Sequence, residues 1–272
     1  MLTISTSLST LQSQGMERID AQLLLLHVLG KTQMQRGWLL AHDTDVLTPT
    51  QAHALHTLAQ RRMQGEPLAY ITGHKAFYGL DLAVDARVLD PRADTETLVD
   101  WALEVLPQPQ ATVLDLGTGS GAIALALKVT RPGWQVSAVD FSLDALTVAQ
   151  VNAQSLGLNV RFSQGSWLTS VTGRFDAIVS NPPYIAAADP HLAALHNEPL
   201  QALSSGADGL DDIRTIITQA PAHLLPGGWL LLEHGYDQAA AVRALLTQAG
   251  FTQVQSRRDL ADVERCSGGQ TV

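Results

Sequence analysis

The fold is decided by the stretch Val113-Leu114-Asp115-Leu116-Gly117-Thr118-Gly119-Ser120-Gly121. It starts as a buried apolar strand and runs into a glycine loop, and the apolar residues from Ala122 to Lys128 then continue as a helix. Glycines at every second position let the backbone turn tightly and approach a ligand without interference from Cβ atoms. In a parallel α/β sheet, such a loop follows the first strand and binds a nucleotide-type ligand.

The spacing of these glycines narrows the choice of ligand. They read G-x-G-x-G, whereas the dinucleotide fingerprint is G-x-G-x-x-G and the phosphate loop ends in Gly-Lys-Ser/Thr. An acidic residue directly ahead of the loop suits a ligand with a cationic amino group and no pyrophosphate, and S-adenosylmethionine is such a ligand. We therefore predict an S-adenosylmethionine site that contains Asp115, Gly117, Thr118, Gly119, Ser120 and Gly121.

A second acidic residue, Asp140, ends the next predicted strand, Gln135 to Val139. A carboxylate at this point, about twenty residues past the glycine loop, is placed to accept hydrogen bonds from both ribose hydroxyls. The alternative is that Asp140 only caps the following helix, where Ser142 and Asp144 are also available as capping residues. The two roles are compatible with each other.

Short β-branched runs alternate with helical stretches from Ala111 onward. This alternation predicts an α/β domain with a parallel sheet that is covered by helices on both faces. We expect strands near 112–116, 135–139, 159–163, 175–180, 228–233 and 252–256, and helices near 120–130, 142–155, 209–224 and 236–249.

The first 73 residues show helical spacing without strand-like alternation. Apolar residues recur three or four apart ahead of Gly30, at Ile19, Leu23, Leu26 and Leu29, and a second helical segment runs from about Gln51 to Met63. Two short runs, 74–78 and 80–84, then flank Gly79 in the manner of a hairpin. We expect a small helical domain over residues 1–73, then a hairpin linker and the main domain over residues 74–272.

The strand predicted at 175–180 delivers Asn181-Pro182-Pro183-Tyr184 to the carboxyl edge of the sheet. Because prolines have no N–H and hold the preceding residue extended, the Asn181 side-chain oxygen and the Pro182 carbonyl form a rigid pair of acceptors. An NH2 group could donate to both oxygens and keep its nitrogen in line for methylation without a dedicated acid or base. Tyr184 offers a flat face to a planar amide or base. We predict all four residues as catalytic and substrate-binding; the alternative is a polyproline-like turn.

Composition argues against several classes of protein. The formal net charge of −9 disfavours nucleic acid as a partner, because duplex binding depends on Lys and Arg. The single cysteine, Cys266, excludes an intrachain disulfide and a multi-cysteine zinc site, and we expect it to be a small buried apolar residue. The nine histidines lack metal-ligand spacing. Neither a signal peptide nor a membrane span is recognisable, so we expect a cytoplasmic protein without a metal.

The chain resembles the protein-(glutamine-N5) methyltransferases that act on class 1 peptide chain release factors, known as the PrmC or HemK family. The similarity covers nearly the whole sequence. Beside the glycine loop, it is carried by Ala21-Gln22-Leu23-Leu24-Leu25, Gly65-Glu66-Pro67-Leu68-Ala69-Tyr70-Ile71-Thr72-Gly73, Val88-Leu89-Asp90-Pro91-Arg92-Ala93-Asp94-Thr95-Glu96, Asn181-Pro182-Pro183-Tyr184-Ile185 and Glu198-Pro199-Leu200.

The resemblance implies a seven-stranded, Rossmann-like methyltransferase domain behind a helical domain that helps to hold the release factor. It implies that Trp167 lies near the adenine, although a tryptophan is by itself more often core packing. It also implies that Asn181 contacts both the cofactor and the glutamine of a Gly-Gly-Gln motif. The methyl group would move from S-adenosylmethionine to N5 of that glutamine, leaving S-adenosylhomocysteine. We expect a monomer with neither nucleic acid nor membrane as partner.

Three positions depart from the pattern of the relatives. Ser166 stands where they usually carry Asp, which puts one polar contact near the adenine in doubt. Asp90 stands where an apolar residue is commoner. The tail, Ser267-Gly268-Gly269-Gln270, contains the supposed target tripeptide itself; chance is the simplest explanation, and a self-inhibitory or self-modified tail is the bolder one.

Two other functions remain open from the residues alone. A DNA or RNA amino-methyltransferase is the first, because Asn-Pro-Pro-Tyr also suits an exocyclic base nitrogen, but acidic charge disfavours it. The second is a binding module that keeps the cofactor pocket without catalysis, and the intact Asn181 to Tyr184 segment argues against it.

Overall fold

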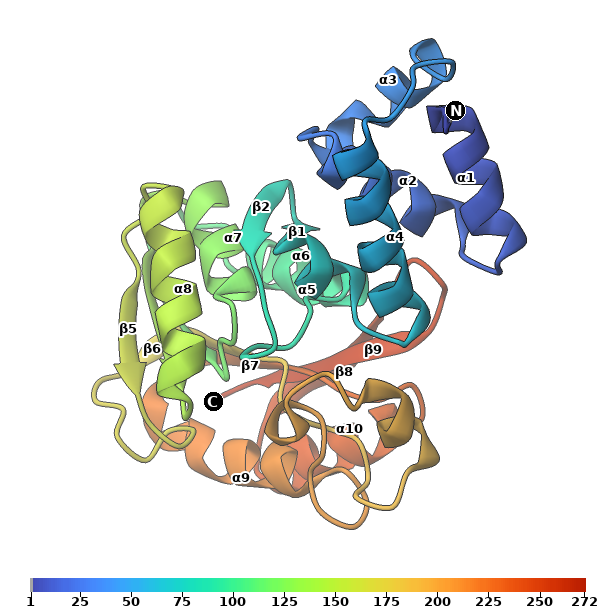
Figure 1. Cartoon of the computed structure of the whole chain (residues 1–272). Helices are drawn as coiled ribbons and strands as arrows, with labels where there is room; N and C mark the ends of the chain where they lie inside the picture. The colour runs from blue at the N-terminus through green and yellow to red at the C-terminus, as the bar shows by residue number, and fades with distance from the viewer. Residues whose placement is uncertain (1) are drawn as a thin grey trace. The chain divides into compact units, whose positions relative to one another are not determined.

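The computed structural model describes residues 2–272, except the side chain of Met34. The chain divides into two compact units, Met1–Gly73 and His74–Val272. The first unit is helical, and the second contains both β-sheets (Figure 1).

Six short helical segments make up the N-terminal unit: α1 (Ile4–Ser13), α2 (Arg18–Val28), η1 (Gln33–Gln35), α3 (Arg36–Ala41), α4 (Pro49–Met63) and α5 (Leu68–Thr72). The helix expected around Gln51 to Met63 is confirmed as α4, and the Thr48 hydroxyl accepts a hydrogen bond from the Gln51 N–H at its start. The apolar face expected on α2 is wrong in part, since Ile19 is 37% exposed. This helix packs against both α1 and α4, so it buries a wider arc that comprises Ala21, Leu24, Leu25 and Leu26.

A two-stranded hairpin opens the second unit. Strands β1 (His74–Phe77) and β2 (Leu80–Ala83) are antiparallel. The two turn residues both have positive φ, 49° at Tyr78 and 75° at Gly79, as a tight hairpin turn requires. The hairpin predicted from sequence is therefore present.

The main sheet has seven strands in the order β5-β4-β3-β6-β7-β9-β8. The first five in this order are parallel, and β9 is antiparallel to both of its neighbours. The strands are β3 (Thr112–Leu116), β4 (Gln135–Asp140), β5 (Arg161–Gln164), β6 (Phe175–Ser180), β7 (Leu224–Glu233), β8 (Thr252–Arg258) and β9 (Glu264–Gln270). The expected seven-stranded, Rossmann-like sheet is confirmed.

Helices cover both faces of this sheet, with α6, α7 and α8 on one face and α9 and α10 on the other (Figure 1). They are α6 (Glu96–Val105), α7 (Ala122–Thr130), α8 (Leu143–Ser155), α9 (Asp211–Gln219) and α10 (Ala239–Gln248). Short 3-10 turns occur at η2 (Ala93–Thr95), η3 (Pro190–Leu195), η4 (Leu200–Ala202) and η5 (Ala220–His223).

The helix predicted over 209–224 is wrong in extent. Helix α9 ends at Gln219, and η5 carries the chain from there to β7, which begins at Leu224 rather than at 228. Pro221 lies in η5. Because proline lacks an N–H and clashes with the preceding turn, the α-helix gives way to a tighter turn at this point.

Strand β9 contains the tail motif and was not predicted. A Cβ atom on Gly268 would lie 2.6 Å from the Leu230 carbonyl oxygen, so only glycine allows this close pairing with β7. The Gln270 side chain donates to the Gly227 carbonyl over 2.7 Å and accepts from Gln253 over 2.6 Å. Cys266 in the same strand is fully buried, as expected. The tail motif is thus a strand paired on both sides.

Candidate functional site

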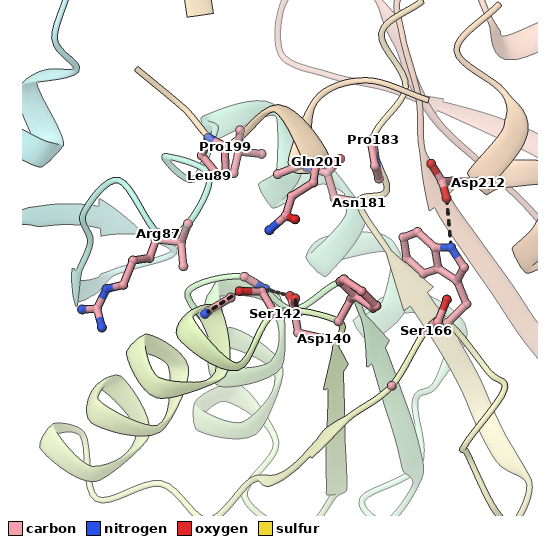
Figure 2. Close-up of a pocket in the computed structure, with 18 residues that line it drawn as sticks. Arg87, Leu89, Asp140, Ser142, Ser166, Asn181, Pro183, Pro199, Gln201 and Asp212 are labelled. Atoms are coloured by element: carbon pink, nitrogen blue, oxygen red, sulfur yellow. Dashed lines mark hydrogen bonds between the residues drawn. The ribbon is translucent and has the colours of Figure 1, made fainter. Parts of the chain in front are cut away.

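The carboxyl ends of β3, β4 and β6 form one edge of the main unit. Leu116 pairs with Val139 on one side and with Ser180 on the other. The next residues of the three strands therefore meet at the same level of the sheet. These residues are Gly117, Asp140 and Asn181, and all three line a cavity of about 250 Å³ (Figure 2).

The glycine loop closes one wall of this cavity. Gly117, Gly119 and Gly121 have φ values of 68°, 56° and 84°, in the left-handed region that favours glycine. A Cβ atom on Gly117 would lie 3.3 Å from the Trp167 ring. Of the predicted loop residues, Gly117 and Gly119 line the cavity, and the others are placed behind it: Asp115, Thr118, Ser120 and Gly121.

Asp115 lies beneath the loop and is completely buried. One carboxylate oxygen accepts from the Thr118 hydroxyl over 2.6 Å and from the Ala124 N–H over 3.3 Å. Its other oxygen has no hydrogen-bond partner within residues 2–272. Burial raises the pKa of Asp115 to about 7, against the hydrogen bonds from Thr118 and Ala124. The geometry makes Asp115 a support of the loop, and its direct contact with a cofactor stays a prediction.

Asp140 ties the glycine loop to the start of α8. It accepts from the Gly119 N–H over 2.8 Å and from the Ser142 N–H over 2.9 Å, one bond to each oxygen (Figure 2). Each oxygen keeps a lone pair for a further donor. Burial raises the pKa of Asp140, against these backbone hydrogen bonds. The helix cap itself is the Ser142 hydroxyl, which accepts from the Ala145 N–H over 3.2 Å.

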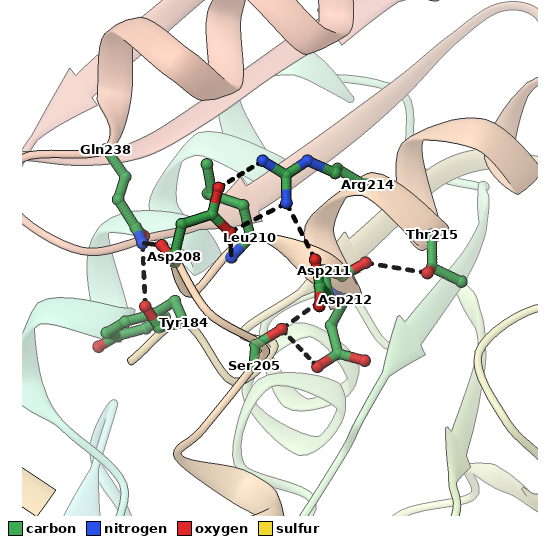
Figure 3. A network of polar contacts seen from close by, with 9 residues as sticks. All are labelled: Tyr184, Ser205, Asp208, Leu210, Asp211, Asp212, Arg214, Thr215 and Gln238. Carbon is green, nitrogen blue, oxygen red and sulfur yellow. Dashed lines mark hydrogen bonds and ion pairs between the residues drawn. The ribbon is translucent and has the colours of Figure 1, made fainter. Parts of the chain in front are cut away.

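Trp167 forms a further part of the cavity wall, beside Gly117. Its backbone has φ 50°, in a region where residues other than glycine are uncommon, so its position is held by its surroundings. The indole N–H donates to Asp212 over 2.9 Å. Ser205 donates to the other Asp212 oxygen over 2.6 Å (Figure 3). Ser166, the residue before it, also lines the cavity.

Asn181 lies where the cavity meets the end of β6. Its side-chain NH2 donates to the Thr95 hydroxyl over 3.2 Å, whereas its oxygen Oδ1 is buried and has no partner in the described structure. Pro182 and Pro183 are buried, and Pro183 lines the cavity. Among the described residues, no hydrogen bond reaches the Pro182 carbonyl. Neither predicted acceptor accepts an N–H of the described backbone, but only Asn181 lines the cavity, and Pro182 is not among its lining residues.

A second cavity of about 80 Å³ adjoins the first. The two share Leu89, Asn181 and Ala202, and Arg92 and Tyr184 line the smaller one alone. Asn181 therefore faces a large cavity on one side and a small one on the other. Two other charged residues between positions 92 and 96 make contacts within the fold. Asp94 pairs with Arg265 at 3.4 Å, and Glu96 accepts a hydrogen bond from the Tyr78 N–H over 2.7 Å.

Behind the smaller cavity, the Tyr184 hydroxyl donates to Glu233 over 3.3 Å. The Tyr184 carbonyl accepts from the Gln238 side chain over 2.9 Å (Figure 3). Burial raises the pKa of Tyr184. Sequence reasoning missed Thr95, Asp212 and Glu233. The sequence does contain a signal for Glu233, because this acidic residue ends a predicted strand just as Asp140 does.

Residues 2–272 contain no group of three or more His, Cys, Asp or Glu residues that could hold a metal ion. Within the same part of the chain, no helix combines the length and the apolar character that a membrane crossing needs.

Comparison with known proteins places the chain in a family. Residues 4–73 match the PrmC N-terminal domain, and residues 95–208 match the methyltransferase small domain. A release factor glutamine methyltransferase from Bordetella pertussis is 50% identical over 264 residues, which cover 95% of this chain and 97% of that protein. The chain belongs to the release factor glutamine methyltransferase family.

Members of this family match the chain along its whole length. The release factor glutamine methyltransferase of Pseudomonas aeruginosa is 49% identical over 278 residues, which cover 99% of each protein. A solved structure of a methyltransferase from Pyrococcus furiosus shares the fold, with a TM-score of 0.55 and 18% identity over 78% of this chain and 98% of that one. The family resemblance noted in the sequence is confirmed.

Proposed function

We propose that this chain, as an S-adenosylmethionine-dependent protein methyltransferase, transfers a methyl group to N5 of the glutamine in the Gly-Gly-Gln motif of class 1 release factors. The observation that carries the proposal is the buried, unpartnered Oδ1 of Asn181 between two cavities. A buried polar atom without a partner is costly, so a site that keeps one is built for a donor that arrives with the ligand. An NH2 group is such a donor.

The larger cavity fits S-adenosylmethionine. Asp140 has lone pairs free for the ribose hydroxyls, Trp167 offers a flat apolar wall for the adenine, and Gly117 lets the ligand approach the backbone. When bound, S-adenosylmethionine supplies an electrophilic methyl group next to a positively charged sulfur. Ser166 contributes only a short hydroxyl to the cavity wall beside Trp167. Polar contacts with the adenine are therefore left to Asp212 and the residues next to it.

The smaller cavity fits a side-chain amide. Asn181 Oδ1 and the Pro182 carbonyl each accept one N–H of the incoming amide, and this orients its nitrogen toward the larger cavity. As the nitrogen gains positive character in the transition state, its hydrogens become stronger donors to both oxygens. Tyr184 packs its ring against the planar amide. The chain's own part in the reaction is therefore to orient the amide and to stabilise its charge.

The N-terminal unit is proposed to hold the release factor. Its match to the PrmC N-terminal domain supports this role, and it carries exposed apolar side chains that suit a protein partner, namely Leu40, Val46 and Met63. Replacement of Leu40 by Ser is expected to raise the KM for release factor without a change in donor affinity. One chain holds both cavities, so the proposed enzyme acts as a monomer, in the cytoplasm where release factors meet the ribosome.

The test is transfer of tritiated methyl groups from S-adenosylmethionine into purified class 1 release factor. Label is expected in the wild-type factor and absent from a factor whose Gly-Gly-Gln glutamine is replaced by alanine. DNA and RNA are run as competing acceptors. Label in a nucleic acid, or label that persists in the alanine variant of the factor, would overturn the proposal.

A further inference from the structure

The acceptor amide of the proposed reaction has a carbonyl oxygen that also needs a partner. Asn181 Oδ1 and the Pro182 carbonyl are proposed to accept its two N–H groups, and neither of these oxygens can donate to the carbonyl. A polar atom that leaves water without gaining a hydrogen bond weakens binding. The side chains that can donate into the smaller cavity are therefore the candidates.

Three side chains that line the smaller cavity carry hydrogen-bond donors: Arg92, Asn181 and Tyr184. The other side chains that line it are leucine, isoleucine and alanine. The Asn181 NH2 already donates to Thr95 over 3.2 Å, and the Tyr184 hydroxyl donates to Glu233 over 3.3 Å. Arg92 has the largest number of donors, because a guanidinium carries five N–H groups.

Two carboxylates hold the Arg92 guanidinium in place. One terminal nitrogen donates to Glu198 over 2.5 Å, and the other donates to Asp90 over 3.3 Å. The Glu198 side chain is only 3% exposed, and it also accepts from the Asp90 N–H over 3.3 Å. These two bonds use two of the five N–H groups of Arg92, so three have no bond to the residues that the structure describes.

The charge of Arg92 is secured by the same two partners. Burial lowers the pKa of Arg92, but the charges of Glu198 and Asp90 outweigh burial and raise this pKa above its ordinary value. Lys75 pairs with Asp90 at 3.0 Å, so the two carboxylates face two cations. The guanidinium is therefore a fixed cation with spare donors at the smaller cavity.

The ion pair between Arg92 and Glu198 also joins two walls of the site, although the two residues are 106 positions apart in the sequence. Leu89 shortly precedes Arg92, and Ala202 shortly follows Glu198. Both of these residues line the larger cavity as well as the smaller one. The ion pair thus fastens the guanidinium to the part of the site that the two cavities share.

We propose that Arg92 binds the carbonyl oxygen of the acceptor amide, and that Glu198 and Asp90 are positioning residues that hold its guanidinium. The inference rests on the function proposed above and defines the substrate class. Asn181 Oδ1 accepts from the NH2 and Arg92 donates to the carbonyl, so the two side chains together select a neutral primary amide. A carboxylate lacks the N–H groups that Asn181 needs, and the guanidinium repels an ammonium group.

The test compares two peptides that differ only in this carbonyl. One contains Gly-Gly-Gln, and the other contains Gly-Gly-ornithine, in which a methylene replaces the side-chain carbonyl and the terminal nitrogen stays in place. We expect the full chain, saturated with S-adenosylhomocysteine, to bind the glutamine peptide roughly 10- to 100-fold more tightly. Calorimetry measures both Kd values.

Arg92→Met removes the donors and the charge. It is combined with Glu198→Gln, so that no buried carboxylate loses its partner. In this double variant the preference for the glutamine peptide is expected to fall below about threefold, with the Kd for S-adenosylmethionine within about twofold of wild type. Arg92→Lys keeps the charge without the planar fork, and an intermediate preference is expected.

Arg257→Met is the matched control. The Arg257 side chain is 36% exposed, as is that of Arg92, and it pairs with Glu104, but it lines neither cavity. This variant is expected to keep the wild-type preference. A preference that survives in the double variant of Arg92 and Glu198 would overturn the proposal and leave the carbonyl to another donor, such as the second hydrogen of the Asn181 NH2.

Nitrogen-15 spectra give a readout that does not depend on release factor. The Nε–H signal of Arg92 is identified by its absence from Arg92→Lys, and acetamide is the probe. Acetamide is expected to shift this signal, whereas methylammonium leaves it in place. If release factor takes up no label, the proposed function fails, and this titration still decides the role of Arg92. An Arg92 signal that acetamide does not move contradicts that role.

Discussion

The indole N–H of Trp167 donates to Asp212 over 2.9 Å and so joins the loop after β5 to helix α9. This bond fixes the flat wall of the larger cavity, because the tryptophan backbone lies in an unfavoured region and the ring rests against Gly117. The wall thus depends on a residue 45 positions further along the chain.

Asp212→Ala is therefore expected to weaken binding of S-adenosylmethionine. The variant frees the indole and also removes the acceptor for Ser205, so the wall loses its support. Loss of one or two such bonds predicts a rise in Kd of about 10-fold, measured by calorimetry. Asp211→Ala, at the exposed neighbouring position on α9, serves as control. Equal affinities in the two variants would show that Trp167 needs no such support.

Asp140→Ala is expected to weaken donor binding further, by roughly 10- to 100-fold in Kd. The variant removes the ribose acceptor and also the tie to the Gly119 N–H. Asp144→Ala in the exposed first turn of α8 keeps the donor affinity of wild type. Calorimetry that finds no change in the Asp140 variant contradicts the assignment of this carboxylate to the ribose.

Asn181→Ala separates chemistry from donor binding. Removal of the amide takes away one of the two acceptors for the substrate NH2, so kcat falls about 100- to 1000-fold, as with loss of a single polar group that stabilises a transition state. The Kd for S-adenosylmethionine stays within about threefold, because the ribose and adenine contacts proposed above are unaffected. Single-turnover methyl transfer gives the first quantity and calorimetry the second. A variant with normal turnover removes Asn181 from the mechanism.

Glu233→Gln is expected to change how stability depends on pH. Because burial raises the pKa of Glu233 from 4.5 to about 7, the folded state binds more protons than the unfolded state between these two values. Wild-type stability contributed by this group is thus present below pH 4.5 and is lost as the pH rises through 7. Glutamine removes that loss, so the variant gains roughly 3 kcal/mol on wild type between pH 4.5 and pH 8.

Urea unfolding of both proteins at the two pH values measures this difference. A stability difference that does not change with pH would mean that Glu233 titrates normally. A gain at pH 8 combined with lower activity would fit a residue kept for the site at some expense of stability.

Gln270 is expected to remain unmethylated. Its side-chain nitrogen is hydrogen-bonded to the Gly227 carbonyl, and the glycines before it are held between β7 and β8. Incubation with S-adenosylmethionine followed by mass spectrometry of the C-terminal peptide checks this. A 14 Da increase on Gln270 would revive the self-modified tail that the sequence raised.

Much of the fold could be predicted because its signals are local. The strand–loop–helix around Gly117 and the acidic end of the second strand follow from periodicity and spacing, and both are where they were expected. Strand β9 could not be found in this way. Its polar, glycine-rich residues have no alternation, and it is a strand only because β7 and β8 pair with it from either side.

The site residues fall into the same two groups, those that local sequence signals predict and those that they do not. Asp140 and Asn181 follow strands directly, so the register of the sheet brings them together. Thr95 and Asp212 reach the site from η2 and α9. No local pattern in the sequence indicates where these two elements pack. Sequence therefore predicts the residues at the strand ends, and the structure adds those that orient them.

The place of β9 between β7 and β8 also sets an order of assembly. β8 precedes β9 along the chain, yet it joins the sheet only through β9. Until residues 264–270 are synthesised, β7 has an unpaired edge and β8 has no partner in the sheet, which leaves both open to wrong pairing. A nascent chain that stalls before this point holds every residue of both cavities and still lacks a closed sheet to support them.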